Sequence, residues 1–393
     1  MENILLILAL IMSCGIVLIT VPPTVRVARA KHLFDVTNDR KVHITSTPTL
    51  GGISIFMAIS ITTAILTVGH PAAGNQILYA AMIMLFFVGV KDDIIYIAPH
   101  TKFFIQLLVA FMLVILGDYS ITNFEGILGI HKVPPIIGYS FTIAFIVLMI
   151  NAYNLIDGID GLAGIMGITV SLFFGAWFYM NGLFSLAILS AAVLGSLIGF
   201  LRFNLYGKEY KIFMGDTGSL LLGLLMAMQV IWFLQYNLSP TIPYPVNAAA
   251  SIALAVVAIP LMDTLRVFTL RIVRNQSPFH PDNNHIHHRL LIFLPKHLHC
   301  SLSIAAGNLF IIFLALLLSF SGLNINIQFF GILVISSAVS MFPGILIGII
   351  KRRKISRPIK PFSELELKVM NYNIKYKGEP VKSLKVEEKE EKK

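Results

Sequence analysis

The chain has 393 residues, of which 56% are apolar and only 13% are charged, and its mean hydropathy is +0.81. An ordinary soluble domain carries about 25% charged residues, so this composition excludes a soluble globular protein, a disordered chain and a small secreted scaffold. Thirty Lys and Arg outnumber twenty Asp and Glu, giving a net charge of +10. In so apolar a chain this excess indicates a membrane protein with basic loops on one side, rather than a nucleic-acid-binding protein.

Apolar segments follow one another along most of the chain, and each is long enough to cross a bilayer as a helix of about 20 residues. The segments are residues 3–21, 49–69, 75–90, 101–117, 136–155, 161–181, 183–202, 217–235, 246–264, 302–321 and 325–350. We therefore predict an all-α polytopic membrane protein with about eleven transmembrane helices.

The basic residues predict the orientation of these helices. With eleven crossings, alternate loops and the tail from residue 351 lie on one side of the membrane, and together they hold every Lys and Arg except Lys132. Because basic loops stay in the cytoplasm, we expect the N-terminus outside and the C-terminus in the cytoplasm. The chain then consists of an integral membrane domain, 1–350, and a charged cytoplasmic tail, 351–393, that is partly disordered.

Carboxylates gather on the same side as the basic loops. Six stand where a predicted helix meets the cytosol: Asp92, Asp93, Asp157, Asp160, Asp216 and Asp263. An ionised carboxylate at membrane depth costs about 2.5–3.5 kcal/mol, so each needs water, a cation or a partner. Solvation at the interface accounts for any one of them, whereas the whole set in glycine-rich contexts favours a binding site.

The segment Asn151–Gly161 has a polar residue at every third position. On a regular helix its two ends lie on opposite faces, but the glycines within it favour a loosened helix. The amide oxygen of Asn154 and the carboxylates of Asp157 and Asp160 can then converge. Oxygen ligands of this kind suit a hard cation.

The segment Phe213–Ser219 places Asp216 between two glycines just before an apolar helix. Capping of the helix by Asp216 or Thr217 is one explanation. The glycines suggest in addition that the backbone approaches a ligand here, and a helix N-terminus favours an anion or a metal-bound phosphate.

The last predicted cytoplasmic loop is rich in cationic and imidazole side chains. It contains Arg266, Arg271, Arg274, His280, His285, His287, His288 and Arg289. Zinc binding is disfavoured because no HExxH pattern or cysteine accompanies the histidines. Arg offers a bidentate fork to phosphate oxygens, so the loop favours a pyrophosphate clamp.

Taken in chain order, these motifs resemble the polyprenyl-phosphate N-acetylhexosamine-1-phosphate transferases of glycosyltransferase family 4. The resemblance is closer to the bacterial undecaprenyl-phosphate GlcNAc-1-phosphate transferase branch and spans about residues 1–350. It rests on Asp35–Gly52, Gly89–Asp93 with Lys102, Asn151–Gly161, Phe203-Asn204, Phe213–Ser219 and Ser277–Arg289. Two departures, Lys91 and the segment Lys208–Lys211, concern the shape of the nucleotide pocket rather than the reaction.

The resemblance implies a role for each motif residue. It implies catalytic roles for Asp92, Asp93, Asp157 and Asp160, and a Mg²⁺ site, with Mn²⁺ as a substitute, at Asp216 and Asn154. It implies a lipid-phosphate contact from Lys102 and nucleotide-sugar contacts from Asn204, Phe213, His285, His287, His288 and Arg289, with Phe213 stacking on uracil.

The implied reaction transfers GlcNAc-1-phosphate from UDP-GlcNAc to undecaprenyl phosphate at the cytoplasmic face of the bacterial inner membrane. It begins a cell-envelope polysaccharide; a homodimer is compatible with it, and no nucleic acid takes part. Within the same class, UDP-MurNAc-pentapeptide is the alternative donor. An ion-coupled transporter is the alternative from another class, but its acids belong near the middle of helices, whereas these stand at helix ends.

Overall fold

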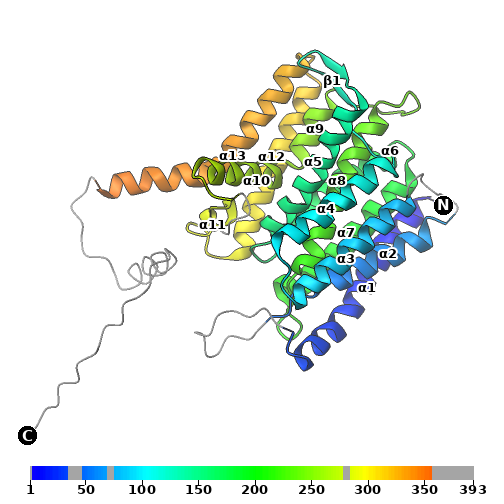
Figure 1. Cartoon of the computed structure of the whole chain (residues 1–393), viewed down its shortest axis with the longest axis vertical. Helices are drawn as coiled ribbons and strands as arrows, with labels where there is room; N and C mark the ends of the chain where they lie inside the picture. Colours follow the sequence, from blue (N-terminus) through cyan, green and yellow to red (C-terminus); the bar gives the residue numbers. More distant parts are fainter. Residues whose placement is uncertain (1, 34–46, 69–74, 278–283, 356–393) are drawn as a thin grey trace, which may run out of the picture. The chain divides into compact units, whose positions relative to one another are not determined.

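The computed structural model describes residues 2–33, 47–68, 75–277 and 284–355, and this part of the chain is mostly helical (Figure 1). Most of Asp35–Gly52, residues 278–283 of the last loop and the tail from 356 lie outside the described residues. The helices are α1 Glu2–Ala30, α2 Gly51–Leu66, α3 Asn75–Ile94, α4 Pro99–Ile115, α5 Pro135–Ile156, α6 Leu162–Met180, α7 Phe184–Tyr206, α8 Gly215–Asn237, α9 Ala249–Val256, α10 Ala258–Val273, α11 Ile286–Leu290, α12 His297–Ser319 and α13 Ile325–Ile355.

The chain divides into two compact units, Met1–Gly344 and Ile345–Lys393. Of the second unit only the end of α13 is described. In the first unit α8 is the central helix, since every residue from Thr217 to Phe233 is buried. Helices α2, α3, α5, α6 and α9 pack around it (Figure 1).

The outer helices expose apolar side chains. Ile4 on α1, Phe310 on α12 and Val334 on α13 are 69%, 55% and 66% exposed. Apolar surface of this extent is not stable in water and suits contact with lipid tails. Seven described helices are long and apolar enough to cross a membrane, or eight if α9 and α10 form one broken span. The protein is therefore a multi-pass membrane protein.

Every predicted apolar segment overlaps one of these helices or the pair α9 and α10. Helices α2 and α4 are apolar but shorter, at 16 and 17 residues. The number of eleven crossings and the orientation of the chain stay predictions.

A two-stranded hairpin, which the all-α prediction did not contain, joins α4 to α5. Strands β1 Asn123–Ile127 and β2 Ile130–Lys132 pair antiparallel. Gly126 and Gly129 adopt φ of +91° and +75°, which glycine tolerates. The carboxylate of Glu125 accepts a hydrogen bond from the Ala250 N–H at 2.9 Å, so the hairpin caps the start of α9.

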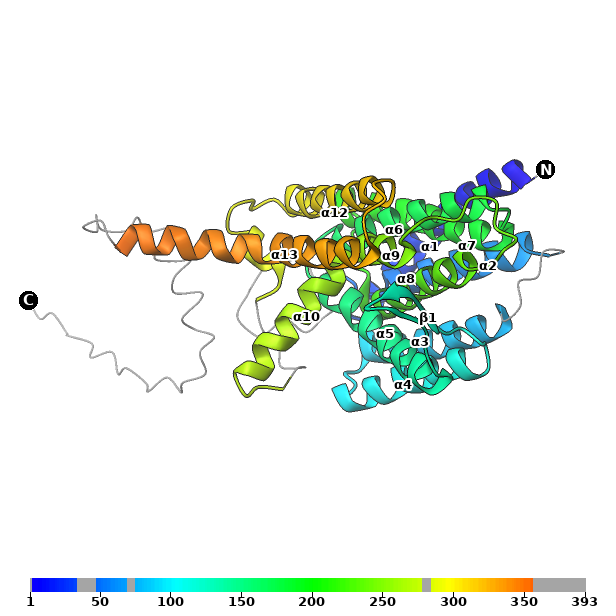
Figure 2. The ribbon, with the colours of Figure 1, turned by 90° about the horizontal axis from the view of Figure 1, so that it is seen from above.

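Helices α9 and α10 meet at a bend of 76°, and Figure 2 shows α10 turned away from the bundle. At the bend, some buried backbone N–H and carbonyl groups have no hydrogen-bond partner within their own helix. The side chain of Asn308 on α12 pairs with two of them: its Oδ1 accepts from the Ile259 N–H at 3.1 Å, and its Nδ2 donates to the Val256 carbonyl at 3.0 Å. A broken helix inside a membrane protein requires such a partner.

We expect Asn308→Ala to destabilise this bend, because both backbone groups lose their partner. Interhelical hydrogen bonds of this kind contribute about 1–2 kcal/mol in total, so the unfolding temperature in detergent should fall. Leu309→Ala on the outer face of the same helix, where Leu309 is 54% exposed, is the control. Equal unfolding temperatures of the two variants would contradict the role of Asn308.

Candidate active site

The start of α8 is held by the chain segment that enters α2. The backbone N–H groups of Gly51 and Gly52 donate to the carbonyls of Phe213 and Met214 at 2.9 and 2.8 Å. In return, the Phe213 N–H donates to the carbonyl of Pro48 at 2.8 Å. These bonds fix the loop that carries Phe213 and Asp216.

The glycines of this motif serve packing of the chain against itself. Gly215 has φ +70°, and a Cβ at this position would lie 1.9 Å from the carbonyl oxygen of Thr49. A Cβ at Gly52 would lie 2.1 Å from the backbone nitrogen of Gly218. These glycines therefore let α2 and its preceding turn touch α8, and the expectation that the backbone approaches a ligand here stays a prediction.

Asp93 at the end of α3 caps α8 from outside. Its carboxylate accepts hydrogen bonds from the backbone N–H groups of Asp216 and Thr217 at 2.7 and 3.0 Å, and from the Thr217 hydroxyl at 2.5 Å. Neither Asp216 nor Thr217 caps its own helix. Burial raises the pKa of Asp93 to about 7, although these hydrogen bonds act in the opposite direction. Asp93 therefore positions Asp216.

Asp216 is surrounded by polar side chains from α3, α4 and α5. The Lys102 ammonium contacts its Oδ2 at 2.5 Å and also pairs with Asp92. The Asn154 amide nitrogen donates to Asp216 Oδ1 at 2.6 Å and to the Ser219 hydroxyl at 2.9 Å. Burial raises the pKa of Asp92 to about 6. One ammonium is thus shared by two carboxylates that approach each other.

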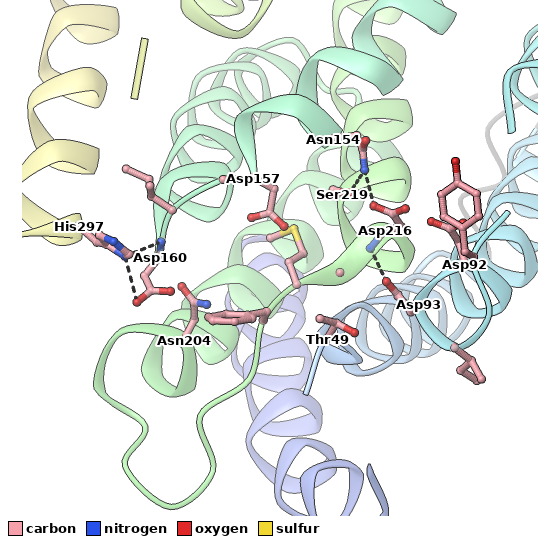
Figure 3. A pocket seen from close by; sticks show the side chains of 17 residues that line it. Thr49, Asp92, Asp93, Asn154, Asp157, Asp160, Asn204, Asp216, Ser219 and His297 are labelled. Carbon is pink, nitrogen blue, oxygen red and sulfur yellow. Dashed lines mark hydrogen bonds and ion pairs between the residues drawn. The ribbon is translucent and has the colours of Figure 1, made fainter. Parts of the chain in front are cut away.

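These groups border a cavity of about 540 Å³, which we call the acidic cavity (Figure 3). Eight of the predicted site residues line it: Asp92, Asp93, Asn154, Asp157, Asp160, Asn204, Phe213 and Asp216. The structure therefore brings predicted residues from α3, the end of α5, the end of α7 and the start of α8 together around one cavity.

Asp157 differs from the other acids of the acidic cavity. It directly follows α5, and within the described chain its carboxylate has no hydrogen-bond or ion-pair partner. Burial raises the pKa of Asp157 well above its usual value, and the neighbouring charges of Asp216, Asp93 and Asp160 raise it further. A carboxylate kept without a partner in a cavity is available to a ligand.

Asp160 lies at the far side of the acidic cavity and is already paired (Figure 3). Its Oδ2 contacts Lys211 Nζ at 2.8 Å and His297 Nδ1 at 3.3 Å. The ammonium of Lys211 also lies 5.7 Å from the centre of the Phe213 ring. These contacts fix the position of Asp160, together with the loop that carries Phe213.

Asn204 uses its whole amide to join two loops. Its Oδ1 accepts from the Gly161 N–H at 2.7 Å, and its Nδ2 donates to the Ile212 carbonyl at 3.0 Å. This side chain is 4% exposed. Asn204 therefore shapes the acidic cavity through the backbone of both loops.

A second cavity of about 350 Å³ adjoins the first, and we call it the histidine cavity. It is lined by Lys102, His285, His287 and His288 from the predicted set, together with Gln106 and Arg271. Tyr96, Asn154, Asp157 and Gly158 border both cavities. The unpaired carboxylate of Asp157 therefore stands at the boundary between the two.

His287 packs directly against this boundary. A Cβ at Gly158 would lie 2.3 Å from His287 Nε2, so only glycine admits the ring here. His287 is 1% exposed, and neither ring nitrogen has a partner within the described chain. Burial, with the adjacent His288 and His285, lowers the pKa of His287 to about 3, which keeps the ring neutral.

Arg289 is the one predicted residue that, in the part of the chain the structure describes, lines neither cavity. Its Nη2 donates to the side chain of Asn284 at 3.3 Å. The position follows from α11, where Arg289 stands two residues beyond His287 and so projects from a different face of the helix.

Some side chains at these cavities escaped the sequence prediction. Ser219 and His297 line the acidic cavity, and Gln106 lines the histidine cavity. Arg271 also lines the histidine cavity, but it belongs to the loop that the sequence predicted as a pyrophosphate clamp. Ser219 stands one helical turn after Asp216, so the spacing could have indicated it. His297 follows Pro295 and Lys296 with no motif around it, and only the fold brings it to Asp160.

Comparison with known proteins agrees with this site. Residues 75–234 match the glycosyl transferase family 4. The chain is 33% identical over 269 residues to the undecaprenyl-phosphate alpha-N-acetylglucosaminyl 1-phosphate transferase of Escherichia coli (strain K12), covering 68% of this chain and 71% of that protein. It is 30% identical over 301 residues to the probable undecaprenyl-phosphate N-acetylglucosaminyl 1-phosphate transferase of Bacillus subtilis (strain 168), covering 74% and 79%.

The fold and the site thus define a multi-pass membrane protein with a polar, acidic pair of cavities at one end of its helices. The chain belongs to glycosyl transferase family 4 and to the bacterial branch represented by these relatives.

We expect Asp157→Asn to stabilise the protein in metal-free buffer at pH 8. The pKa of Asp157 is higher in the folded than in the unfolded chain, so ionisation at high pH costs stability that an amide does not lose. The gain should be about 0.5–2 kcal/mol and should shrink as the pH falls towards 5, because the wild-type carboxylate becomes protonated. Thermal unfolding in detergent at both pH values measures it.

Asp93→Asn is the matched comparison. Its amide would turn an NH₂ group towards the donors at the start of α8, so we expect a loss of about 1–3 kcal/mol. If Asp157→Asn lost as much stability as Asp93→Asn, Asp157 would have a structural partner after all.

Proposed function

We propose that the protein transfers GlcNAc-1-phosphate from UDP-GlcNAc to undecaprenyl phosphate, giving undecaprenyl-pyrophosphate-GlcNAc and UMP. The observation that carries the proposal is the unpaired Asp157 carboxylate at the boundary of two adjoining cavities. Two cavities meeting at one reactive point suit a reaction between two phosphate-bearing substrates. The names of the relatives support GlcNAc as the sugar.

In this proposal the acidic cavity receives the uridine end of the donor. Phe213, 37% exposed at its rim, offers an aromatic face on which uracil can stack. The adjoining histidine cavity receives the lipid phosphate, since it holds Lys102 and the apolar side chains of Phe103 and Leu155. The pyrophosphate then lies at the shared boundary, next to Asp157.

A cation is needed because both substrates are anions and the acidic cavity is itself negative. The ammonium of Lys102 between Asp92 and Asp216 indicates that this place favours positive charge. In the described chain no three His, Cys, Asp or Glu side chains form a ready metal cluster. Asp216, Ser219 and Asn154 nevertheless supply the hard oxygen donors that Mg²⁺ prefers.

Asp216 and Asn154 would hold Mg²⁺ through their side-chain oxygens. The bound ion supplies positive charge to the pyrophosphate and to the departing UMP. Lys102, released from Asp216, then has an ammonium group for the lipid phosphate. Mn²⁺, which accepts the same oxygen ligands, substitutes for Mg²⁺.

The chemistry is a direct in-line attack by an oxygen of the lipid phosphate on the β-phosphorus of UDP-GlcNAc, which breaks the bond to the UMP oxygen. A phosphate monoester has a second pKa near 6, so most of the nucleophile is already a dianion at neutral pH. A strong base is unnecessary. Asp92 and Asp93 serve here to position Lys102 and Asp216 rather than to attack, so no aspartyl-phosphate forms.

The released nucleotide tests this reaction. Membranes supplied with UDP-GlcNAc, Mg²⁺ and undecaprenyl phosphate should release UMP; UDP would mean ordinary glycosyl transfer and would contradict the proposal. Asp216→Asn should lower turnover by about a hundredfold or more, because it removes a charged metal ligand. Asp118→Asn, the same change far from both cavities, is the matched control and should keep full activity. UDP-MurNAc-pentapeptide should neither react nor compete.

Removal of divalent cations should abolish turnover. We expect EDTA to stop the release of UMP, and added Mg²⁺ or Mn²⁺ to restore it, since the acids around Asp216 repel both substrates without a cation. Ca²⁺, which prefers longer bonds and more ligands, should restore less. Full activity in EDTA would remove the metal from the proposal.

A further inference from the structure

Asp263 is a buried carboxylate to which the reaction above gives no role. It lies on α10, shortly after the bend, and is 1% exposed. An unpaired charge at such a place would be costly. The partners of Asp263 are therefore informative about its role.

Both oxygens of Asp263 are used. Oδ2 lies 2.8 Å from His285 Nδ1. Oδ1 accepts from Arg266 Nη2 at 2.6 Å and from the Ile286 N–H at 2.9 Å. Arg266 also donates to the Asn284 carbonyl at 2.7 Å, so this carboxylate joins α10 to the start of α11. The ion pair with Arg266 keeps Asp263 ionised.

An ionised carboxylate only accepts hydrogen bonds. The hydrogen in the contact with His285 must therefore be on Nδ1, and in the neutral tautomer of the ring the lone pair is then on Nε2. His285 lines the histidine cavity and is 4% exposed, and its Nε2 has no partner within the described chain. A buried acceptor without a partner destabilises the folded state, and a donor on the substrate removes that cost.

We propose that Asp263 is a positioning residue of the transferase: it holds His285 in the Nδ1–H tautomer, so that Nε2 is the hydrogen-bond acceptor for a sugar hydroxyl of the substrate. This inference rests on the proposed function, because it requires a substrate in the histidine cavity. It adds Asp263 to the site as a residue that acts only through His285.

Asp263→Asn changes the tautomer with little change in shape. The one side-chain oxygen of the new amide accepts the hydrogen bonds from Arg266 and the Ile286 N–H, so its NH₂ group faces His285. Nδ1 must then accept, and the hydrogen moves to Nε2, which becomes a donor. We expect kcat for UMP release to fall about 10–100-fold, the usual cost of losing such a partner. The KM for UDP-GlcNAc should rise as well, because the sugar hydroxyl loses its acceptor in the bound substrate.

A double-mutant cycle separates positioning from a structural role. In a His285→Leu background there is no ring to orient, so Asp263→Asn should lower kcat by less than about twofold further. An equal loss in both backgrounds would overturn the inference. Asp263→Glu, which keeps a carboxylate for His285 and Arg266, should recover part of the activity. Glu125→Gln, at a half-buried carboxylate that caps another helix, is the control and should leave kcat unchanged.

Loss of the ion pair with Arg266 can prevent Asp263→Asn from folding, and His285 then provides the test. His285→Gln can donate its NH₂ to Asp263 while its oxygen replaces Nε2 as an acceptor; His285→Leu can do neither. We expect at least tenfold higher kcat for Gln than for Leu, and equal values would overturn the inference. Absence of UMP release by the wild-type protein would instead refute the proposed function, before any variant is compared.

Discussion

The burial of carboxylates at one end of an apolar helix bundle is the constraint on which the rest of the structure depends. Each buried charge requires a partner, and the chain supplies a different one each time. Asp93 receives the N-terminus of α8, where the free N–H groups and the helix dipole favour an anion. Asp92 and Asp216 share the ammonium of Lys102. Because these partners come from different helices, pairing the charges also fixes how the helices pack.

Asp157 is the exception that gives the arrangement a function. The acids around it have partners, so the one carboxyl group left for a ligand in the described part of the site stands at the boundary of the two cavities. His287, neutral and without partners, packs against Gly158 beside it. Unsatisfied groups cost stability, and a folded protein keeps them mainly where a ligand completes them. The proposed site therefore lies where buried polar groups have no partner among the described residues and can bind a substrate.

The sequence predicted which residues gather, but not what each one does there. The lengths of the apolar segments predicted the helices. The motifs in chain order predicted eight of the residues that line the acidic cavity. Three roles depend on which helices become neighbours. Asp93 caps a helix distant in sequence, Asn204 holds two loops together, and Gly52 contacts α8. A single sequence does not contain that information. The hairpin was missed for a similar reason. It has few residues and no long apolar pattern in the sequence, and its stability comes from the pairing of its strands and from its contact with α9.

The bend between α9 and α10 links the fold to the chemistry. A straight helix would have carried α10 on along the bundle, whereas the bend, satisfied by Asn308, turns Asp263 and Arg266 towards the start of α11. Non-helical backbone at membrane depth is tolerated only where protein or a cavity satisfies it. An apolar replacement of Asn308 would therefore do more than weaken one helix contact. It would remove the geometric reason why His285 and His287 reach a cavity that α4, α5 and α8 also line.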